Sequence, residues 1–292
     1  MRDPRRSFTP LSIALAVLIL ATGLLVQVLR QPVAATGLLR VRVLDVGQGD
    51  AILIDTPGNQ HVLVDGGPDD RVVTLIGRYL VPPQRFRLVV ASHNHQDHVG
   101  GLPAVLGRFP IEEVWISGSI HTTATYEQFL RAIQASNART EVVHAGHTLT
   151  LDGVELRVLH PFDDATDQRP ADQHETTIVI RATYGAVSVL LTGDLDMDHE
   201  RALIERDRAS LGATVLKVTH HGSQYGSTAR FLEAVHPEIA IISVGEGNRY
   251  DHPAPEALER LEALDIPIYR TDQHGTIAIT SDGVSIWTEA ER

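Results

Sequence analysis

Four side chains of the types that bind metal ions lie within six consecutive positions, in the run His93-Asn94-His95-Gln96-Asp97-His98. Imidazole and carboxylate groups are donors suited to zinc. A loop that leaves a strand can direct His93 and His95 at one ion, and Asp97 and His98 at a second. A polar surface loop is the weaker interpretation, because a predicted strand at residues 87–91, apolar from Leu88 to Ala91, precedes the cluster. The spacing therefore predicts a metal centre.

Composition restricts the chemistry that this centre can have. The 292-residue chain has no cysteine, which excludes thiolate ligands and a cysteine nucleophile. Residues 1–36 carry four arginines against Asp3, a net charge of +3, so the remainder has 21 basic against 36 acidic residues, or −15. This acidic body lacks the basic footprint typical of nucleic-acid binding, although a cationic metal centre can still attract a phosphate locally.

The histidine run matches the HxHxDH signature of the metallo-β-lactamase superfamily, which the sequence resembles. Five further blocks resemble the extracytoplasmic hydrolase domain of the ComEC competence proteins: LDVGQGDA at 44–51, VDGG at 64–67, LTGD at 191–194, LKVTHHGS at 216–223 and RTDQHG at 270–275. The blocks extend over nearly all of residues 38–288. The multi-span channel domain of ComEC is absent from the sequence, so we expect a freestanding relative with one membrane segment.

The resemblance implies further metal ligands. Asp194 matches the carboxylate that bridges the two ions in the superfamily. One residue of the pair His220-His221 matches the last ligand; we favour His221, with His220 as a neighbouring or substrate-contacting group, although adjacent side chains point in different directions and the sequence leaves the choice open. The expected cofactors are two divalent ions, Zn²⁺ in the first instance, with Mn²⁺ as the alternative.

The third ligand of the first ion is expected between residues 145 and 190. His174 fits best, because it directly precedes a predicted strand at residues 177–183. His160 and His147 remain alternatives. A histidine here departs from the family pattern, since ComEC relatives are often rich in asparagine in this region.

Other matched residues have less certain roles. Asp65 either accepts a hydrogen bond from a ligand histidine or shapes the following Gly66-Gly67 turn. Asp45 and Asp50 suit a turn role at least as well as a catalytic one. Lys217, the one lysine of the chain, could neutralise an anionic substrate or lie at a strand edge. Further matches fall near the expected mouth of the cleft, where His252 is a candidate proton donor: Ser223, Tyr250, His252 and His274.

The expected reaction is hydrolysis by a hydroxide shared between two metal ions, because zinc lowers the pKa of bound water to about 7. Asp97, His220, His252 and Lys217 are the predicted catalytic residues. The resemblance favours a phosphodiester or other anionic substrate, including DNA. The alternatives are a hydrolase of β-lactam, lactone or thioester bonds, and a non-catalytic accessory module of DNA uptake. The nearly complete ligand set favours catalysis, since an accessory module should have lost ligands.

The N-terminus predicts a membrane segment. The basic stretch 1–10 precedes residues 11–29, which contain no charge and are long enough to span a bilayer, at about 28 Å of helix. We expect a transmembrane helix or signal anchor that places the catalytic domain outside the cytoplasm of a bacterial cell. The sequence Val33-Ala34-Ala35 also resembles a cleavage site, and cleavage would give a secreted protein.

The remainder predicts one α/β domain at residues 38–292, after a linker at 30–37. Short apolar runs predict strands at 38–44, 51–54, 61–65, 87–91, 113–116, 141–144, 154–159, 177–183, 187–192, 214–219, 239–243, 266–270, 276–280 and 284–287. Periodic segments predict helices at 102–108, 125–136, 197–209, 227–236 and 255–264. Two sheets with helices outside, a four-layer αββα sandwich, fit this order.

Overall fold

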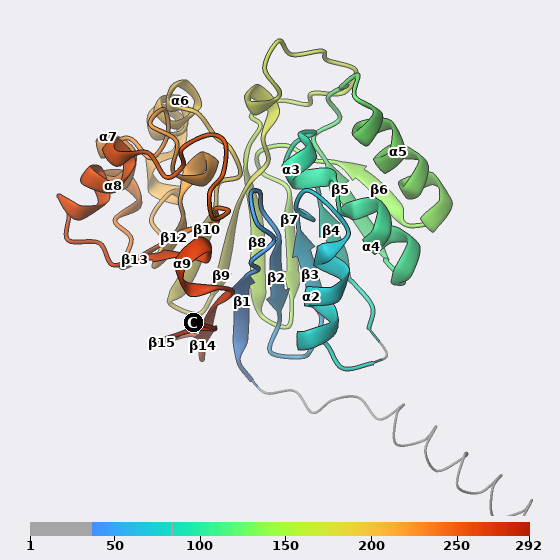
Figure 1. Ribbon diagram of the computed structural model, residues 1–292, viewed down its shortest axis with the longest axis horizontal. Coiled ribbons are helices and arrows are strands. Elements are labelled where there is room, and N and C mark those ends of the chain that lie inside the picture. Colours follow the sequence, from blue (N-terminus) through green and yellow to red (C-terminus); the bar gives the residue numbers. More distant parts are fainter. Residues whose placement is uncertain (1–36, 83) are drawn as a thin grey trace, which may run out of the picture.

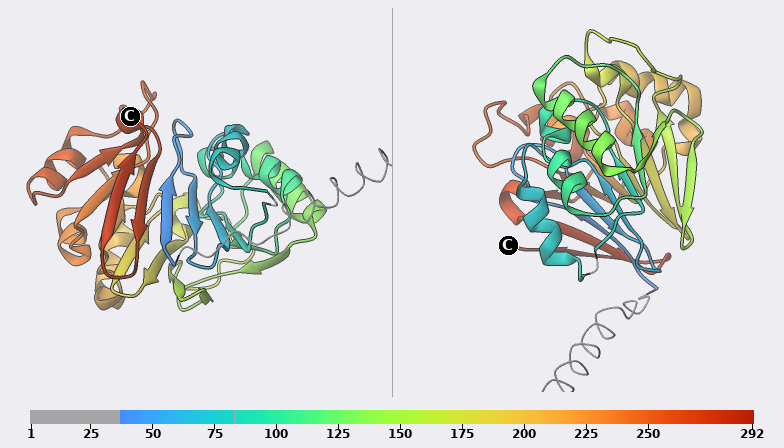
Figure 2. Two further views of the ribbon diagram at one scale, coloured as in Figure 1. Left: turned by 90° about the horizontal axis from the view of Figure 1, so that it is seen from below. Right: turned by 90° about the vertical axis from the view of Figure 1, so that its right-hand side faces the viewer.

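The computed structural model describes residues 37–82 and 84–292. They form two β-sheets that pack face to face, with helices on both outer sides (Figures 1 and 2). The predicted αββα sandwich is therefore confirmed for this part of the chain.

The first sheet has eight strands in the order β15-β14-β1-β2-β3-β4-β5-β6. Their bounds are β1 Leu39–Val43, β2 Ile52–Asp55, β3 His61–Val64, β4 Leu88–Val90, β5 Glu113–Ile116, β6 Arg139–Val142, β14 Ile277–Ser281 and β15 Ile286–Ala290. The strands from β15 to β3 pair antiparallel, and those from β3 to β6 pair parallel. The parallel strand β4 is buried on both faces, which explains its uninterrupted apolar sequence.

The second sheet has seven strands in the order β13-β12-β11-β10-β9-β8-β7. Their bounds are β7 Thr148–Leu151, β8 Val154–His160, β9 Val179–Tyr184, β10 Val187–Leu191, β11 Val215–Lys217, β12 Ile239–Ile242 and β13 Ile268–Arg270. Strands β7 to β10 pair antiparallel and β10 to β13 pair parallel. The sequence prediction omitted β7, although its threonine–leucine alternation is typical of a half-buried strand.

Helices cover both outer faces. Their bounds are α2 Arg71–Tyr79, α3 Gln96–Val99, α4 Leu102–Arg108, α5 Ala124–Ser136, α6 Met197–Asp207, α7 Ala229–Val235, α8 Pro255–Glu262 and α9 Thr271–His274. Three short 3-10 helices occupy Gln173–Thr176, Arg208–Ser210 and Thr219–Gly222. Helix α2 was not predicted, yet its buried residues Val72, Leu75 and Ile76 have helical spacing.

The apolar core lies in three layers. The central layer joins the facing sides of the two sheets, for example Val41 and Ile54 with Val158 and Ile180. A second layer lies between the first sheet and helices α2, α4 and α5, and a third between the second sheet and α6, α7 and α8. Loops at the carboxyl ends of β4, β10, β11 and β12 are thereby held on rigid elements of both sheets.

The predicted basic stretch 1–10, the membrane segment 11–29 and the linker up to residue 36 lie outside the described residues. Within residues 37–82 and 84–292, no helix has the length and hydrophobicity needed to cross a membrane.

Candidate metal centre

The histidine run begins where buried strand β4 ends. His93 and His98 are fully buried, whereas His95 and Asp97 are partly exposed. We expected a loop, but residues Gln96–Val99 form one helical turn, α3. Backbone bonds fix this turn against two neighbouring loops: Asp50 N donates to Asp97 O at 3.1 Å, and Gly66 N donates to His98 O at 2.7 Å. Successive side chains of the run therefore project in defined, different directions.

A first cluster combines His93, His95 and His174, each with one ring nitrogen within 4.8 Å of the others. The rings of His93 and His95 lie 4.7 Å apart, as do those of His95 and His174. His174 comes from the 3-10 helix before β9, and its Nδ1 lies 2.7 Å from the Asp172 carboxylate. That contact leaves His174 Nε2 directed at the cluster. We call these three residues the open cluster, because His95 and His174 are partly exposed.

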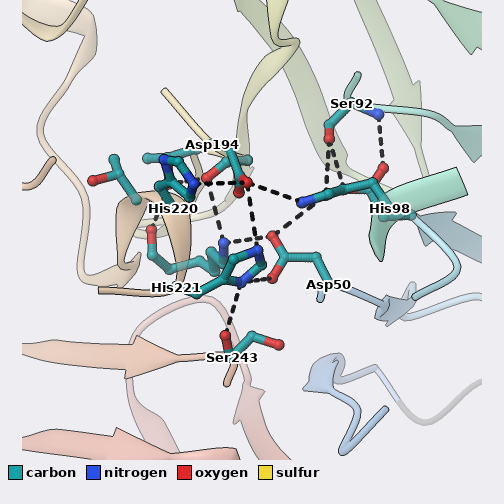
Figure 3. Close-up of polar contacts among 12 residues, drawn as sticks. Asp50, Ser92, His98, Asp194, His220, His221 and Ser243 are labelled. Atoms are coloured by element: carbon teal, nitrogen blue, oxygen red, sulfur yellow. Dashed lines mark hydrogen bonds and ion pairs between the residues drawn. The ribbon is translucent and has the colours of Figure 1, made fainter. Parts of the chain in front are cut away.

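A second cluster combines Asp97, His98, Asp194 and His221 within the same limit of 4.8 Å. Asp194 Oδ2 lies 3.2 Å from His98 Nε2 and 3.4 Å from His221 Nε2 (Figure 3). His221 Nε2 is also 3.4 Å from Asp97 Oδ2. His98, Asp194 and His221 are each at most 1% exposed. We call these four residues the buried cluster.

Asp194 lies between the two clusters. Its Oδ2 is 3.9 Å from Nε2 of both His93 and His174, in addition to its contacts with the buried cluster. The residue follows β10, and the turn at Gly193 has a positive φ of 50° that favours glycine. A single carboxylate thus lies within 3.9 Å of four of the five imidazoles of the two clusters, which is the placement needed to bridge two ions.

The pair His220-His221 follows β11, and the two rings diverge. His221 Nδ1 donates to Ser243 O at 2.9 Å, which directs Nε2 toward Asp194 (Figure 3). His220 instead lies beside His174, with ring centroids 4.5 Å apart, and lines the cavity. Both residues have positive φ values, 46° and 53°, which non-glycine residues rarely adopt. The arrangement places His221 in the buried cluster. His220 lies at the mouth of the cavity, where its Nε2 is 3.7 Å from Asp194 Oδ2 and forms a further candidate ligand group with His174 and Asp194.

Glu200 on α6 stabilises the turn that carries these histidines. Its buried carboxylate accepts bonds from Thr219 Oγ1 at 3.3 Å, from Ser227 N and from Thr228 N at 2.9 Å. Burial raises the pKa of Glu200 to about 7. No sequence motif pointed to this residue, although a glutamate on the apolar side of a predicted helix was a usable signal.

The buried cluster is braced by a layer of polar groups. Asp65 Oδ2 accepts from His98 Nδ1 at 2.8 Å, and its other oxygen accepts from Ser92 N at 2.7 Å. Asp65 thus holds the ring of a candidate ligand histidine, which favours its predicted supporting role, in addition to its place before the turn. Asp50 is fully buried, pairs with the Lys217 ammonium and lies 3.4 Å from His221 Nδ1.

The electrostatics favour positive charge inside the buried cluster. Burial opposes protonation of His98 and His221, but the facing carboxylates outweigh it and raise the pKa of both well above the usual range. Burial would raise the pKa of Asp97, yet the hydrogen bond from His221 and the charge of His98 hold it at about 2. Without a metal, protons thus reside where a divalent cation would neutralise the same carboxylates.

Buried polar atoms without a hydrogen-bond partner show whether the two clusters suit a metal ion. Of the buried side-chain atoms that have no hydrogen-bond partner among the described residues, four belong to the two clusters: His98 Nε2, His174 Nε2, His221 Nε2 and Asp194 Oδ1. Burying such atoms without a partner is costly. They converge on one another at short distances but without hydrogen-bond alignment, the geometry expected around a cation. The donor set of imidazole and carboxylate fits two divalent ions.

A cavity of about 340 Å³ opens over both clusters. Its rim contains His121, Thr123, Arg249, Tyr250 and His252. No motif surrounds His121 in the sequence, yet the loop after β5 carries it to the rim, where its ring centroid lies 5.8 Å from that of His95. Burial lowers the pKa of His252, so its ring is mainly neutral at neutral pH. His252 is therefore better suited to donating a hydrogen bond than to acting as a charged acid.

Several residues that the sequence predicted for the site lie outside the cavity and the two clusters. Lys217 does not reach the cavity: it is 1% exposed, because β11 is covered on both faces, and its Nζ donates to Gly193 O at 3.3 Å. The expectation that it contacts substrate is thus corrected. His160 packs against Phe162 and His199, and His147 against His144, so neither alternative joins the open cluster. Ser223 and His274 do not line the cavity.

The fold and the geometry of the candidate metal ligands together define the class of protein. Residues 44–246 match the metallo-beta-lactamase superfamily, and the chain belongs to that superfamily of metallo-hydrolases. The fold implies divalent metal ions, and the open and buried clusters are two of four overlapping groups among the described residues that could hold one.

Among curated proteins, the chain is similar to ComE operon protein 3 of Bacillus subtilis, with 29% identity over 255 residues that cover 81% of this chain and 32% of that protein. It is 32% identical to competence protein ComA of Neisseria gonorrhoeae over 243 residues, 81% of this chain and 31% of the relative. The chain spans about a third of the length of these relatives.

Solved structures support the fold alone. The metallo-beta-lactamase fold protein YhfI of Bacillus subtilis superposes with a TM-score of 0.53 at 16% identity, covering 86% of this chain and all of that one. The metallo hydrolase Igni18 of Ignicoccus hospitalis gives 0.52 at 14% identity, covering 82% and 98%.

Proposed function

We propose that the protein hydrolyses phosphodiester bonds, with two divalent ions held by the open and buried clusters. The observation that carries the proposal is the placement of Asp194 between two complete ligand sets beneath one cavity. Two-metal sites of this kind suit in-line displacement at phosphorus. The similar proteins are named for competence, and another for recombination, both processes that act on DNA.

The ligand assignments follow from the contacts. His93, His95 and His174 would hold one ion; Asp97, His98 and His221 would hold the other, with Asp194 shared. When bound, the ions would supply an ionised water near neutral pH and polarise the phosphoryl oxygen. Zinc is the first choice for this set of nitrogen and oxygen donors, and manganese the second.

The chain's own groups orient the substrate. His220 and His252, whose rings lie 5.7 Å apart at the mouth, can each donate a hydrogen bond to a phosphate oxygen or to the leaving group. Burial lowers the pKa of His220 to about 4, so it also acts as a neutral donor. Asp97 carries negative charge on the cavity wall and keeps the ligand set anionic enough to retain a cation.

The test compares three substrates on the full-length chain purified in detergent. Bis-p-nitrophenyl phosphate, single-stranded DNA and nitrocefin are assayed with and without chelator, and bound metal is quantified. We expect metal-dependent hydrolysis of the two phosphodiesters, with about two ions per chain. Turnover of nitrocefin alone would replace the phosphodiester assignment by β-lactam hydrolysis. Absence of bound metal would favour a non-catalytic accessory module of DNA uptake.

We also propose that the chain is anchored in a bacterial membrane by residues 11–29, with the catalytic domain outside the cytoplasm. The uncharged stretch and the arginines before it support this orientation. A phosphatase fused to the C-terminus should be active; an expressed but inactive fusion would contradict the orientation.

A further inference from the structure

A second cavity adjoins the one above the metal ligands. It has a volume of about 390 Å³ and shares five lining residues with the first: Gln48, Gln96, Asp97, Arg249 and Tyr250. The shared residues form the boundary between the two spaces, so the cavities are two parts of one groove that passes Asp97. A group bound over the metals can therefore extend to one side, into the second cavity.

Arg249 is the one permanently cationic side chain among the described residues that line either cavity. It belongs to an exposed loop after β12, in a body whose net charge is strongly negative. An exposed arginine is most often a solvated surface group. Its position at the junction of the two cavities, where the other charged linings are carboxylates or histidines, distinguishes Arg249 from the remaining surface arginines.

The guanidinium of Arg249 is held in place without a carboxylate. It lies 4.8 Å from the centroid of the Tyr250 ring, and Nη2 donates to Tyr250 Oη at 2.6 Å. Among the described residues it forms no ion pair, and the Asp97 carboxylate that attracts it lies beyond ion-pair distance. The Tyr250 ring in turn stacks on His252 at 5.9 Å.

Asn248 makes the loop rigid. Its Oδ1 accepts from Tyr250 N and His252 N, each at 3.1 Å, and its Nδ2 donates to Gly245 O at 3.0 Å and to His252 O at 2.6 Å. A loop tied in this way presents Arg249 in a fixed place before substrate arrives, which lowers the ordering cost of binding.

We propose that Arg249 binds the phosphate adjacent to the scissile phosphodiester, and that Tyr250 is a positioning residue that holds the guanidinium toward the second cavity. This rests on the proposed phosphodiester hydrolysis and adds to it that the preferred substrate carries a further phosphate. Guanidinium groups suit this task because their planar donors match phosphate oxygens in pairs.

The experiment uses the metal-loaded full-length chain and a thymidine dinucleotide with one phosphodiester, with or without one added terminal phosphate at either end. In the wild type, we expect the added phosphate at one end to raise kcat/KM about 10-fold or more, as for a hydrogen bond to a charged group. Arg249→Ala should lose most of this ratio. Arg249→Lys should keep part of it, since an ammonium supplies charge without the paired donors.

Salt dependence separates a phosphate contact from a merely structural role. On a ten-residue thymidine oligonucleotide, the slope of log(kcat/KM) against log salt concentration should decrease by about 0.7 in Arg249→Ala. Tyr250→Phe removes the hydroxyl that holds the guanidinium and should lower the dinucleotide ratio by less than Arg249→Ala does. Arg131→Ala, on the surface of α5 and paired with Glu127, is the matched control and should change neither readout.

Two outcomes overturn the inference in distinguishable ways. If the wild type cleaves the dinucleotides equally well with and without the added phosphate, the subsite is refuted while phosphodiester hydrolysis stands. If none of the diesters is cleaved but nitrocefin is, both the subsite and the proposed function are refuted.

Discussion

The open and buried clusters contain similar ligands but differ in how they are supported. Beneath the buried cluster lie Asp65, Asp50 and Lys217, all at most 1% exposed. The open cluster has Asp172, whose side chain is 53% exposed, next to His174. Charges in the interior interact more strongly than charges in water. The comparison indicates that an ion in the buried cluster would be held in a rigid frame, whereas an ion in the open cluster would be held by side chains that solvent reaches.

The largest effect is expected for the carboxylate that the clusters share. Asp194→Ala should lower kcat/KM for bis-p-nitrophenyl phosphate about 1000-fold or more, because the ions contribute several kcal/mol to the transition state. Metal content per chain should fall at both clusters. Asp196→Ala, two residues away, removes the N-cap of α6 and should leave both ions bound. Retention of two ions by Asp194→Ala would mean that the clusters do not share this ligand.

The next effect concerns the ion pair between Lys217 and Asp50, which supports the buried cluster. Lys217→Met leaves the Asp50 carboxylate buried without its partner, which should lower the free energy of unfolding of the metal-free protein by about 3–5 kcal/mol in urea denaturation. The double variant Lys217→Met/Asp50→Asn removes the unpaired charge and should recover part of the loss. A loss below about 1 kcal/mol would show that the frame contributes little.

A fall in pH should destabilise the fold through His160, which lies on the side of the open cluster. His160 Nδ1 donates to Thr177 O at 2.6 Å, beside the 3-10 helix that carries His174. Burial lowers the pKa of His160 to about 4, from an unfolded value of 6.5. A depressed histidine pKa stabilises the fold above pH 6.5, and this contribution is lost as the pH falls toward 4.

The loss should amount to about 3 kcal/mol. It is measured by urea denaturation of chelator-treated protein at pH 7 and pH 4, with His160→Asn as the reference, since asparagine donates a similar bond but does not titrate. The stability difference between wild type and variant should shrink on acidification. A constant difference would refute the assignment.

The smallest effect compares the two supporting carboxylates directly. Asp65→Asn should weaken metal binding at the buried cluster about 10–100-fold, the usual result of removing the partner of a ligand histidine. Asp172→Asn should weaken the open cluster by less, because solvent screens an exposed carboxylate. Competition with a chromogenic chelator gives both affinities. Equal effects would contradict the distinction between the clusters.

Much of this fold was predictable from the sequence. Uninterrupted apolar runs such as β4 mark strands buried on both faces, and the ligands of the run follow β4 directly, so the centre and most of its ligands could be predicted. Burial on both faces also explains why the orientation of Lys217 could not be predicted. Its three-residue strand is covered on both sides, so the sequence contains no polar face that shows which way a side chain points.

Residues placed by long-range contacts could not be assigned. His174 was separable from His160 and His147 only through tertiary pairing, in which Ile178 N donates to Ser92 O at 2.8 Å and brings the 3-10 helix to the histidine run. His121 reaches the rim through a loop without a motif. The divergence of His220 and His221 required backbone angles that no residue pattern encodes.

The pairing of β1 with β14 has a consequence for biosynthesis. Leu39 pairs with Ser281, so an early strand lies between its sequence neighbour β2 and a partner synthesised some 240 residues later. Contacts between such distant segments slow folding. On the ribosome, β1 must wait with one edge unpaired until the β14–β15 hairpin emerges, and during that wait it is exposed to aggregation.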